Sequence, residues 1–245
     1  MKRVMLIVAY DGTDYHGWQF QPGVPTIEGE LNRALGELLG EEIQVIGASR
    51  TDAGVHALCN GAVFDTNTRI PAEKISYALN QRLPDGIKIQ KSMEVPRDFH
   101  PRHCVSRKTY EYRILNREFP LPTKRNYSHF TYVHLDVKKM QKAAEYLVGE
   151  HDFKSFCAVG AVVQTTVRTI DKLSVEKQED EVVIRVCGGG FLYNMVRIIA
   201  GTLMEVGKGN LMPESIKEIL ASRDRSAAGP TAPACGLTLV DYQWS

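Results

Sequence analysis

The sequence contains no long hydrophobic run and no closely spaced pair of cysteines. None of its apolar stretches approaches the ~20 residues of a membrane span, and the apolar part of the segment MKRVMLIVAY is too short for a signal peptide. The five cysteines are odd in number and widely scattered, without a Cys-x-x-Cys pair. This pattern argues against a disulfide framework and a zinc site, and it predicts reduced thiols in the cytoplasm.

Excess charge is also scarce. The 30 Lys and Arg residues nearly balance the 29 Asp and Glu residues, and the formal net charge is only +1. This balance by itself does not indicate a nucleic-acid partner. With 43% hydrophobic and 24% charged residues among 245, the composition predicts a soluble globular protein with one large domain or two smaller ones.

One segment nevertheless concentrates positive charge. Residues 97–125 hold eight basic and three acidic residues, a local charge of +5. Five aromatic residues interleave with these cations, namely Phe99, Tyr110, Tyr112, Phe119 and Tyr127. Cations that contact phosphates and aromatic rings that stack on bases are typical of RNA binding. A solvated basic face is the alternative, because a linear cluster need not fold into one patch.

One carboxylate stands out in the run Ser49-Arg50-Thr51-Asp52-Ala53-Gly54-Val55-His56. Asp52 follows a predicted strand, precedes a glycine-containing turn and is separated from Arg50 by one residue. Burying an aspartate is costly unless its charge is paired, and a nearby arginine keeps it ionised. An ionised, partly desolvated carboxylate can act as a nucleophile. The alternative is an ordinary turn beside a surface ion pair.

Hydrophobic periodicity predicts the order β-α-β-β-α-β in the first part of the chain. Alternating or β-branched runs indicate strands at 2–9, 43–48, 61–66 and 87–93, and helical spacing indicates helices at 26–39 and 71–79. This order is typical of the split β-α-β arrangement of ferredoxin-like folds.

The second part of the chain is predicted to repeat this topology. We expect strands at 109–115 and 237–242, a hairpin of 167–176 with 181–187, and helices at 137–148, 191–206 and 213–221. The sequence thus predicts an α+β fold of two ferredoxin-like halves, residues 1–105 and 106–245. Their sheets would join side by side into an extended antiparallel sheet with helices on one side. Ligands tend to bind in a central cleft of this kind.

Arg197 is a second charged residue in an unusual context, because it lies within an apolar helical run. A charge in such a position needs a partner, and Asp52 from the other half is the candidate. A surface arginine that extends its head group into water is the alternative. Tyr110 and Tyr112 share one face of a strand, where core packing competes with a role in base stacking.

Seven segments resemble successive motifs of the tRNA pseudouridine synthase A family. They are YDGTDYHGWQFQP, SRTDAGVHA, FHPRHCVSRKTYEYRI, GEHDFKSF, VRTI, GGGFLYNMVRIIAGTL and APACGLTLV, in the order of the family and across almost the whole chain. The resemblance implies isomerisation of uridine to pseudouridine at positions 38, 39 and 40 of the tRNA anticodon stem-loop. It also implies a cytoplasmic homodimer that needs no metal or organic cofactor and no membrane.

The resemblance also implies roles for single residues. Asp52 matches the catalytic aspartate of the family, and Arg50 matches the arginine that takes part in flipping the target base. Tyr110 matches the tyrosine that stacks on the uracil. Arg197 matches the arginine that pairs with the aspartate, and Leu237 lines the uracil pocket. Whether the carboxylate attacks C1′, attacks C6 or assists glycal formation stays open.

The chain departs from the family pattern at a few positions. Ser49 replaces a usual glycine, Cys59-Asn60 replaces Gly-Gln, and Gly189 replaces asparagine or aspartate. These changes bear on loop geometry and target preference. Two other functions stay open, a tRNA-binding module without catalysis and a carboxylate-dependent nucleoside hydrolase. The hydrolase would need a second carboxylate, such as Asp11 or Asp14.

Overall fold

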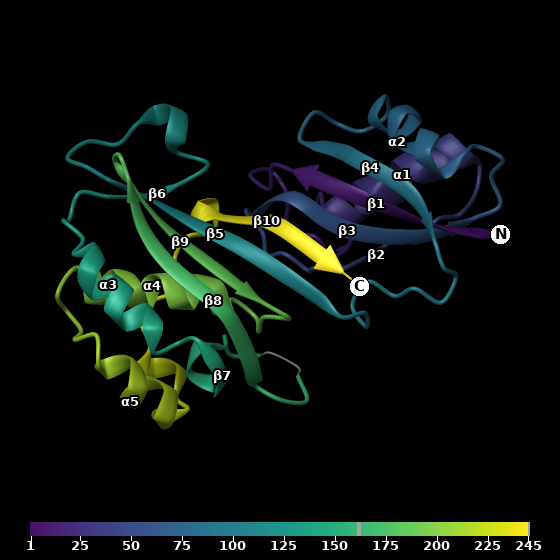
Figure 1. Ribbon diagram of the computed structural model, residues 1–245. Helices are drawn as coiled ribbons and strands as arrows, with labels where there is room; N and C mark the ends of the chain where they lie inside the picture. Colours follow the sequence, from purple (N-terminus) through teal and green to yellow (C-terminus); the bar gives the residue numbers. More distant parts are fainter. Residues whose placement is uncertain (161–162, 245) are drawn as a thin grey trace. The chain divides into compact units, whose positions relative to one another are not determined.

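A computed structural model describes residues 1–160 and 163–244 of the chain (Figure 1). The fold is of the mixed α/β type, with five α-helices in this part of the chain. Its contacts divide the chain into two compact units, unit 1 (Met1–Ser106 with Leu239–Ser245) and unit 2 (Arg107–Thr238). Within the described ranges, no helix is both long and apolar enough to cross a membrane.

The sheet of unit 1 follows the predicted order of elements. Its strands are arranged β4-β1-β3-β10, and the short β2 also pairs with β3. The bounds are β1 Lys2–Tyr10, β2 Ile46–Gly47, β3 His56–Thr66, β4 Ile87–Val95 and β10 Leu237–Trp244. Strand β1 is antiparallel to β3 and β4. The strand predicted at 43–48 shortens to two residues, because the Val45 N–H donates to Asn32 Oδ1 of a helix (2.9 Å) instead of to a strand.

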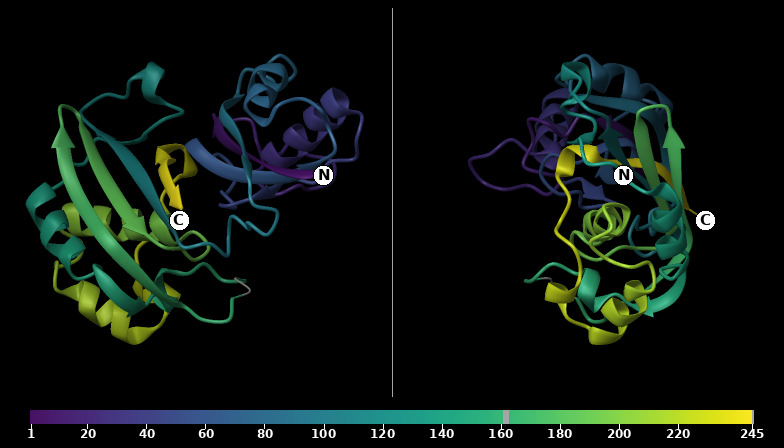
Figure 2. Two further views of the ribbon diagram at one scale, coloured as in Figure 1. Left: turned by 45° about the vertical axis from the view of Figure 1, so that its right-hand side comes forward. Right: turned by 90° about the vertical axis from the view of Figure 1, so that its left-hand side faces the viewer.

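Two helices cover one face of this sheet (Figures 1 and 2). Helix α1 (Ile27–Leu39) begins after Thr26, whose hydroxyl oxygen accepts the Gly29 N–H (3.2 Å), and ends at Gly40, which has a φ of 65°. A side-chain cap and a left-handed glycine are the usual signals for the two ends of a helix. Helix α2 (Ala72–Asn80) follows Pro71 and packs against β4.

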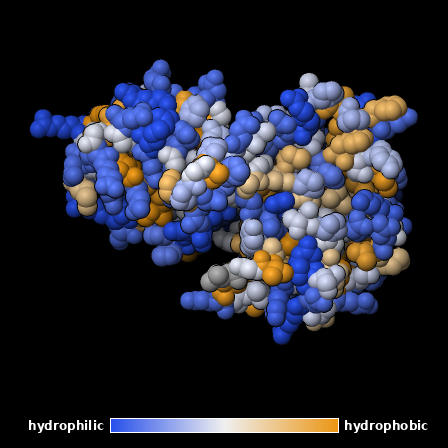
Figure 3. Space-filling model, turned by 180° about the vertical axis from the view of Figure 1, so that it is seen from behind, coloured by the Kyte–Doolittle hydropathy of each residue, from blue (hydrophilic) through white to orange (hydrophobic). Residues whose placement is uncertain are grey.

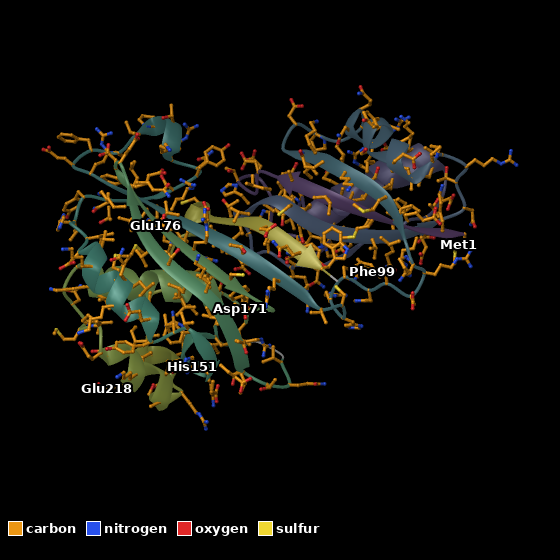
Figure 4. The ribbon with its side chains drawn as sticks, in the orientation of Figure 1. Met1, Phe99, His151, Asp171, Glu176 and Glu218 are labelled. Carbon is orange, nitrogen blue, oxygen red and sulfur yellow. The ribbon has the colours of Figure 1, made fainter. Side chains whose placement is uncertain are left out.

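An apolar cluster within unit 1 is centred on β1, β3 and β10. Met5, Val63 and Tyr242 form its buried centre, and Phe99 packs against them from the chain beyond β4 (Figure 4). Successive strand residues point to opposite faces of a sheet. The side chain of Met5 therefore points to the opposite face of the sheet from the side chains of the residues before and after it. Unit 1 thus buries apolar side chains on both faces of the sheet.

Unit 2 is built on the strand order β5-β9-β8-β7. The bounds are β5 Ser106–Asn116, β6 His129–Thr131, β7 Gly149–Asp152, β8 Val167–Gln178 and β9 Glu181–Gly188. Strands β8 and β9 form the predicted antiparallel hairpin. The expectation of a purely antiparallel sheet is wrong at β6, which pairs with β5 in parallel. Strands β6 and β7 were not predicted, because three or four residues are too few to show a periodic pattern.

Three helices cover one face of the unit 2 sheet (Figures 1 and 2). They are α3 Val137–Glu145, α4 Met195–Gly207 and α5 Ser215–Ser222. Asp136 caps α3, since its Oδ1 accepts the Lys139 N–H (3.1 Å). Helix α4 begins four residues later than predicted, because Asn194 adopts a left-handed conformation with a φ of 59° and so stands outside the helix.

Exposed apolar side chains are dispersed over the surface. On the face seen in Figure 3, hydrophobic residues occur in small groups among hydrophilic ones. Tyr77 on α2 and Tyr132 after β6 are among the most exposed aromatic residues, at 71% and 75% of their full accessibility. Single exposed apolar residues are normal on a protein surface, so each needs a local argument before it indicates a function.

Candidate active site

Asp52 lies in the loop between β2 and β3, where the sequence predicted a turn. Its side chain is half-buried, while that of Arg50 is exposed. The Val55 N–H donates to the Asp52 carbonyl oxygen (3.2 Å) across a turn in which Gly54 has a φ of 77°. The loop therefore holds the backbone of Asp52 in a defined turn and leaves the neighbouring arginine in contact with solvent.

The glycine-rich loop that follows β1 packs against the Asp52 loop by backbone hydrogen bonds. The Trp18 N–H donates to the Thr51 carbonyl oxygen (3.0 Å), and the Gly54 N–H donates to the Tyr15 carbonyl oxygen (3.3 Å). Trp18 itself is buried. These two bonds lie on either side of Asp52 in the sequence, so they fix both ends of the segment that carries the carboxylate.

Two glycines make this close approach possible. A Cβ added at Gly12 would lie 2.1 Å from the Val55 carbonyl oxygen, and one at Gly17 would lie 2.7 Å from the Thr51 carbonyl oxygen. Gly17 also has a φ of 90°, which side chains rarely tolerate. The glycines of this segment thus act by letting its backbone pack directly on the Asp52 loop.

The side chain of Asn60 on β3 is hydrogen-bonded to the same loop. Its Oδ1 accepts the Ser49 N–H (3.1 Å), and its Nδ2 donates to the Ser49 carbonyl oxygen (2.9 Å). Nδ2 also lies 3.3 Å from the hydroxyl of Tyr10, which shares a hydrogen bond with Thr51 Oγ1 (2.7 Å). The side chain of Asn60 is fully buried. The sequence showed Asn60 only as a departure from a family pattern, and it lay just outside the strand predicted at 61–66, so no local signal indicated its structural role.

Asp11 is committed to its own loop. Its Oδ1 accepts the Thr13 N–H (3.0 Å) and the Thr13 hydroxyl (2.6 Å), and it lies 3.2 Å from Nδ1 of His56. The Gly12 N–H points to the same Nδ1 (3.1 Å), so this ring nitrogen has two neighbours of different kinds. A carboxylate that caps its own turn is poorly suited to be the second catalytic acid of a hydrolase.

Tyr110 and Tyr112 of β5 have different surroundings. The ring of Tyr110 meets that of Phe191 edge to face, with centroids 5.3 Å apart. Tyr112 is fully buried, its hydroxyl donates to the Pro233 carbonyl oxygen (2.9 Å), and burial raises its pKa. Tyr112 is therefore a core residue. Tyr110 packs against an aromatic neighbour and keeps 8% of its full accessibility.

Arg197 lies in the first turn of α4 and is held by neighbours within unit 2. Its Nε donates to the Ala232 carbonyl oxygen (2.8 Å), and its Nη1 donates to Asn194 Oδ1 (2.9 Å). The Ala232 N–H donates back to the Arg197 carbonyl oxygen (3.1 Å). These bonds keep the half-buried guanidinium beside the helix end, so it does not extend into water as a surface arginine would.

Leu237 begins β10 and is 5% exposed. The residue before it, Gly236, packs directly on the ring of Tyr112, where an added Cβ would lie 2.7 Å from Cζ. Pro230 lies earlier in the same segment and packs on α4. A Cβ added at Gly201 of that helix would lie 1.8 Å from the Pro230 carbonyl oxygen. The segment that leads to Leu237 is thus fixed against α4 and β5.

The five predicted site residues fall on the two units. Arg50 and Asp52 belong to unit 1, and Tyr110, Arg197 and Leu237 belong to unit 2. In the part of the chain that the structure describes, no group of three or more His, Cys, Asp or Glu side chains could hold a metal ion.

Part of the basic segment serves the structure of unit 2. Arg113 contacts Glu111 (2.8 Å) and Glu181 (2.9 Å), and Arg185 Nε donates to Glu111 (2.9 Å). Burial alone would raise the pKa of Glu111, but the hydrogen bond and charge of Arg185, together with Arg113, lower it overall. These cations neutralise buried carboxylates and so serve the fold of unit 2, whereas other members of the segment, such as Arg125, are exposed to solvent.

Comparison with known proteins gives one consistent result. A family model described as tRNA pseudouridine synthase matches residues 6–103 and 143–245. The chain is 51% identical over 241 residues to the tRNA pseudouridine synthase A of Thermoanaerobacter sp. (strain X514), with 98% of each chain covered. It is 49% identical over 244 residues to that of Acetivibrio thermocellus, which covers 100% of both chains.

One further relative and one solved structure also match the chain. The tRNA pseudouridine synthase A of Brevibacillus brevis is 51% identical over 239 residues, with 98% of each chain covered. A crystal structure of a Cbf5-Nop10-Gar1 complex matches with 14% identity and a TM-score of 0.35, over 82% of this chain and 54% of the other. That likeness is too weak to bear on the fold.

Proposed function

The chain belongs to the tRNA pseudouridine synthase family, and from this premise we propose where and how it acts. It is an isomerase that converts uridine to pseudouridine in tRNA. Its targets in this proposal are positions 38, 39 and 40 of the anticodon stem-loop, and Asp52 is the nucleophile. The observation that carries the proposal is the loop of Asp52, whose backbone is fixed on both sides while its side chain stays half-buried.

The reaction breaks the N1–C1′ bond of uridine, turns the uracil and joins C5 to C1′. The proton on C5 leaves, and N1 gains a proton, so the atoms balance without a redox step or hydrolysis. Asp52 attacks C1′, attacks C6, or removes the 2′ proton in a route through a glycal. Each route needs an ionised carboxylate placed against the flipped nucleotide.

The other site residues bring the base to Asp52. Removing a base from its stack costs a few kcal/mol. Arg50, exposed beside Asp52, holds the RNA open at the vacated position. Stacking on an aromatic ring returns about 1–3 kcal/mol per base, and Tyr110 supplies that ring in this proposal. In its phenolate form Tyr110 also accepts the proton that leaves C5, and Leu237 forms the apolar wall of the uracil pocket.

Arg197 keeps Asp52 ionised by pairing with it. Its attachment to Ala232 and Asn194 fixes the guanidinium before any substrate binds, and a fixed partner costs less side-chain entropy. Replacing Arg197 by alanine should therefore move the acidic limb of the pH–rate profile to higher pH. An acidic limb at the same pH as in the wild type would contradict the pairing.

The proposal includes the arrangement of the chain. Each half, residues 1–105 and 106–245, forms a ferredoxin-like domain, and the two sheets join side by side around a central cleft that receives the tRNA. The protein works in the cytoplasm as a homodimer. The unit 1 order β1-α1-β2-β3-α2-β4 supports the ferredoxin-like assignment of the first half.

Mapping pseudouridines in a tRNA transcript with uridines at 38, 39 and 40 tests this function. We expect modification at these positions with the wild-type protein and none with Asp52→Ala. Asp14→Ala is a matched control, since Asp14 is an exposed aspartate of the neighbouring loop. Pseudouridine confined to other positions would refute the anticodon assignment, and free uracil among the products would identify a hydrolase.

A further inference from the structure

Unit 2 contains a pocket at the end of β5. The pocket has a volume of about 320 Å³ and is lined by Asn116, Arg117, Glu118, Tyr132, His134 and Lys177. This volume is at the lower end of the range for small-ligand sites. Asn116 lies six residues beyond Tyr110 on the same strand, which corresponds to about 20 Å along β5. The pocket is therefore separate from the residues assigned to the uracil.

The wall of the pocket is rigid. The buried side chain of Asn116 donates to the carbonyl oxygens of Thr131 (3.1 Å) and Val133 (2.8 Å). Its Oδ1 accepts the Leu135 N–H (3.2 Å), so both the amide nitrogen and the amide oxygen bind this segment. Thr131 and Leu135 are buried. The residues between them, Tyr132 included, are thereby held outward in a fixed strip.

The lining combines an aromatic ring with cations. Tyr132 is 75% exposed, so it does not serve as a core residue. Arg117 contributes a guanidinium that forms an ion pair with Asp180 (3.2 Å), and both partners of that pair are partly exposed. Such surface pairs contribute little and can exchange for a phosphate. Lys177 comes from β8, directly after Glu176, which Figure 4 labels on that strand.

Exposed aromatic rings and a cation also lie near the pocket in the sequence. Among the described residues of unit 2, four phenylalanine or tyrosine side chains are exposed. Three of them lie in residues 119–132, namely Phe119, Tyr127 and Tyr132. The excursion that carries the first two leaves β5 and returns as β6 (Figure 1). Arg125 is exposed on it. Exposed rings among cations are typical of proteins that bind single-stranded RNA.

We propose that this pocket binds an unpaired nucleotide of the tRNA, other than the uridine that is isomerised. The base stacks on Tyr132, and Arg117 and Lys177 contact the adjoining phosphate. The proposal rests on the proposed function, because it assumes that tRNA is the substrate. The carboxylate of Glu118 also lines the pocket and disfavours a second phosphate. The pocket therefore takes one nucleotide, and the remaining contacts with the backbone lie on the segment after β5.

Binding of an unmodified tRNA transcript to three variants tests the pocket. Tyr132→Ala should weaken binding by about tenfold, which is about 1.4 kcal/mol and within the range for loss of one stacked base. Tyr132→Phe keeps the ring and should bind within about twofold of the wild type. Tyr77→Ala removes an equally exposed tyrosine of unit 1 and should leave the affinity unchanged. Thermal unfolding of each variant verifies that it is folded.

The salt dependence of binding adds an independent readout. Lys177→Gln should reduce the slope of log affinity against log salt by about 1, because one phosphate contact is lost. A tRNA affinity of Tyr132→Ala equal to that of the wild type overturns the proposal. The same unchanged affinity together with a shift from dimer to monomer in sedimentation also overturns it, and identifies the pocket as a contact between two copies of the chain.

These outcomes are separable from a failure of the proposed function. If the wild-type protein forms no pseudouridine at positions 38 to 40, the assigned target is wrong, whatever the affinity of Tyr132→Ala. If the wild type modifies these positions and Tyr132→Ala binds the transcript equally well, only the nucleotide pocket is wrong.

Discussion

The two units hold their site residues by different means. In unit 1, the Asp52 loop is fixed by neutral hydrogen bonds, such as those of Asn60, and by glycine backbones in close contact. In unit 2, Arg197 is fixed by a helix end, and the strand of Tyr110 carries a cluster of ion pairs around Glu111. A neutral network keeps its strength over a wide pH range, whereas an ionic one depends on the charge of its carboxylates.

This difference has a functional meaning. In the proposed function Asp52 has to stay ionised, and a second titratable group in contact with its backbone would couple its own protonation to that of this carboxylate. Support from an amide and two hydroxyl groups avoids such coupling. In the same proposal unit 2 presents a ring, an apolar wall and the guanidinium of Arg197, while the ion pairs around Glu111 stabilise its sheet.

The largest effect on folding is expected from Gly12→Ala. Its new Cβ would lie 2.1 Å from the Val55 carbonyl oxygen, so the two loops must separate. Overpacking of this kind costs about 3 kcal/mol in the free energy of unfolding, and we expect activity to fall with it.

Gly36→Ala is the control, since its Cβ meets only the Glu41 carbonyl oxygen at 3.4 Å. A helical glycine replaced by alanine should raise stability, by up to about 1 kcal/mol. Urea titration of both variants gives the values, and equal stabilities would refute the close-packing argument.

A somewhat smaller loss is expected from Asn60→Ala. It leaves the Ser49 N–H and carbonyl group and the Tyr10 hydroxyl without this partner, at a cost of about 2 kcal/mol. Because the groups are neutral, the loss should be the same at pH 5 and pH 8. Urea unfolding at the two pH values checks this. A loss that changes with pH would show that the network contains a titrating group.

Glu111→Gln should cost less, about 1–2 kcal/mol at pH 7, because Arg113 and Arg185 remain partly solvated. The pKa of Glu111 is lower in the folded chain than its ordinary value of 4.5. Its ionised form therefore stabilises the fold above pH 4.5, and this contribution disappears as the pH falls through the folded pKa. The difference between wild type and variant should shrink below pH 4.5. A constant difference down to pH 3 would contradict the ionic account.

The sequence predicted most of the elements that carry a strong local signal. Thr26 and Asp136 begin helices because each precedes a run of helical periodicity and can accept a backbone N–H. Asp52 was placed correctly in a turn after a strand. The start of α4 was wrong, since Phe191 and Leu192 continue the apolar pattern although the backbone turns left-handed at Asn194.

Long-range contacts could not be predicted. Asn60 reaches Tyr10 across 50 residues and Ser49 across 11, and no local pattern encodes either bond. A strand was expected at 237–242, but the contacts of Leu239–Ser245 with unit 1 depend on tertiary pairing. The assignment of Tyr112 to the core likewise needed its bond to Pro233, 121 residues away.

The most direct test of the account is tritium release from tRNA labelled at C5 of uridine by the Asp52→Ala variant. We predict no release above background at saturating tRNA, because every proposed route needs the carboxylate, while the affinity for tRNA stays close to that of the wild type. Asp14→Ala should release tritium at the wild-type rate. Release by Asp52→Ala at a rate comparable to the wild type would contradict the assignment of Asp52 as the nucleophile.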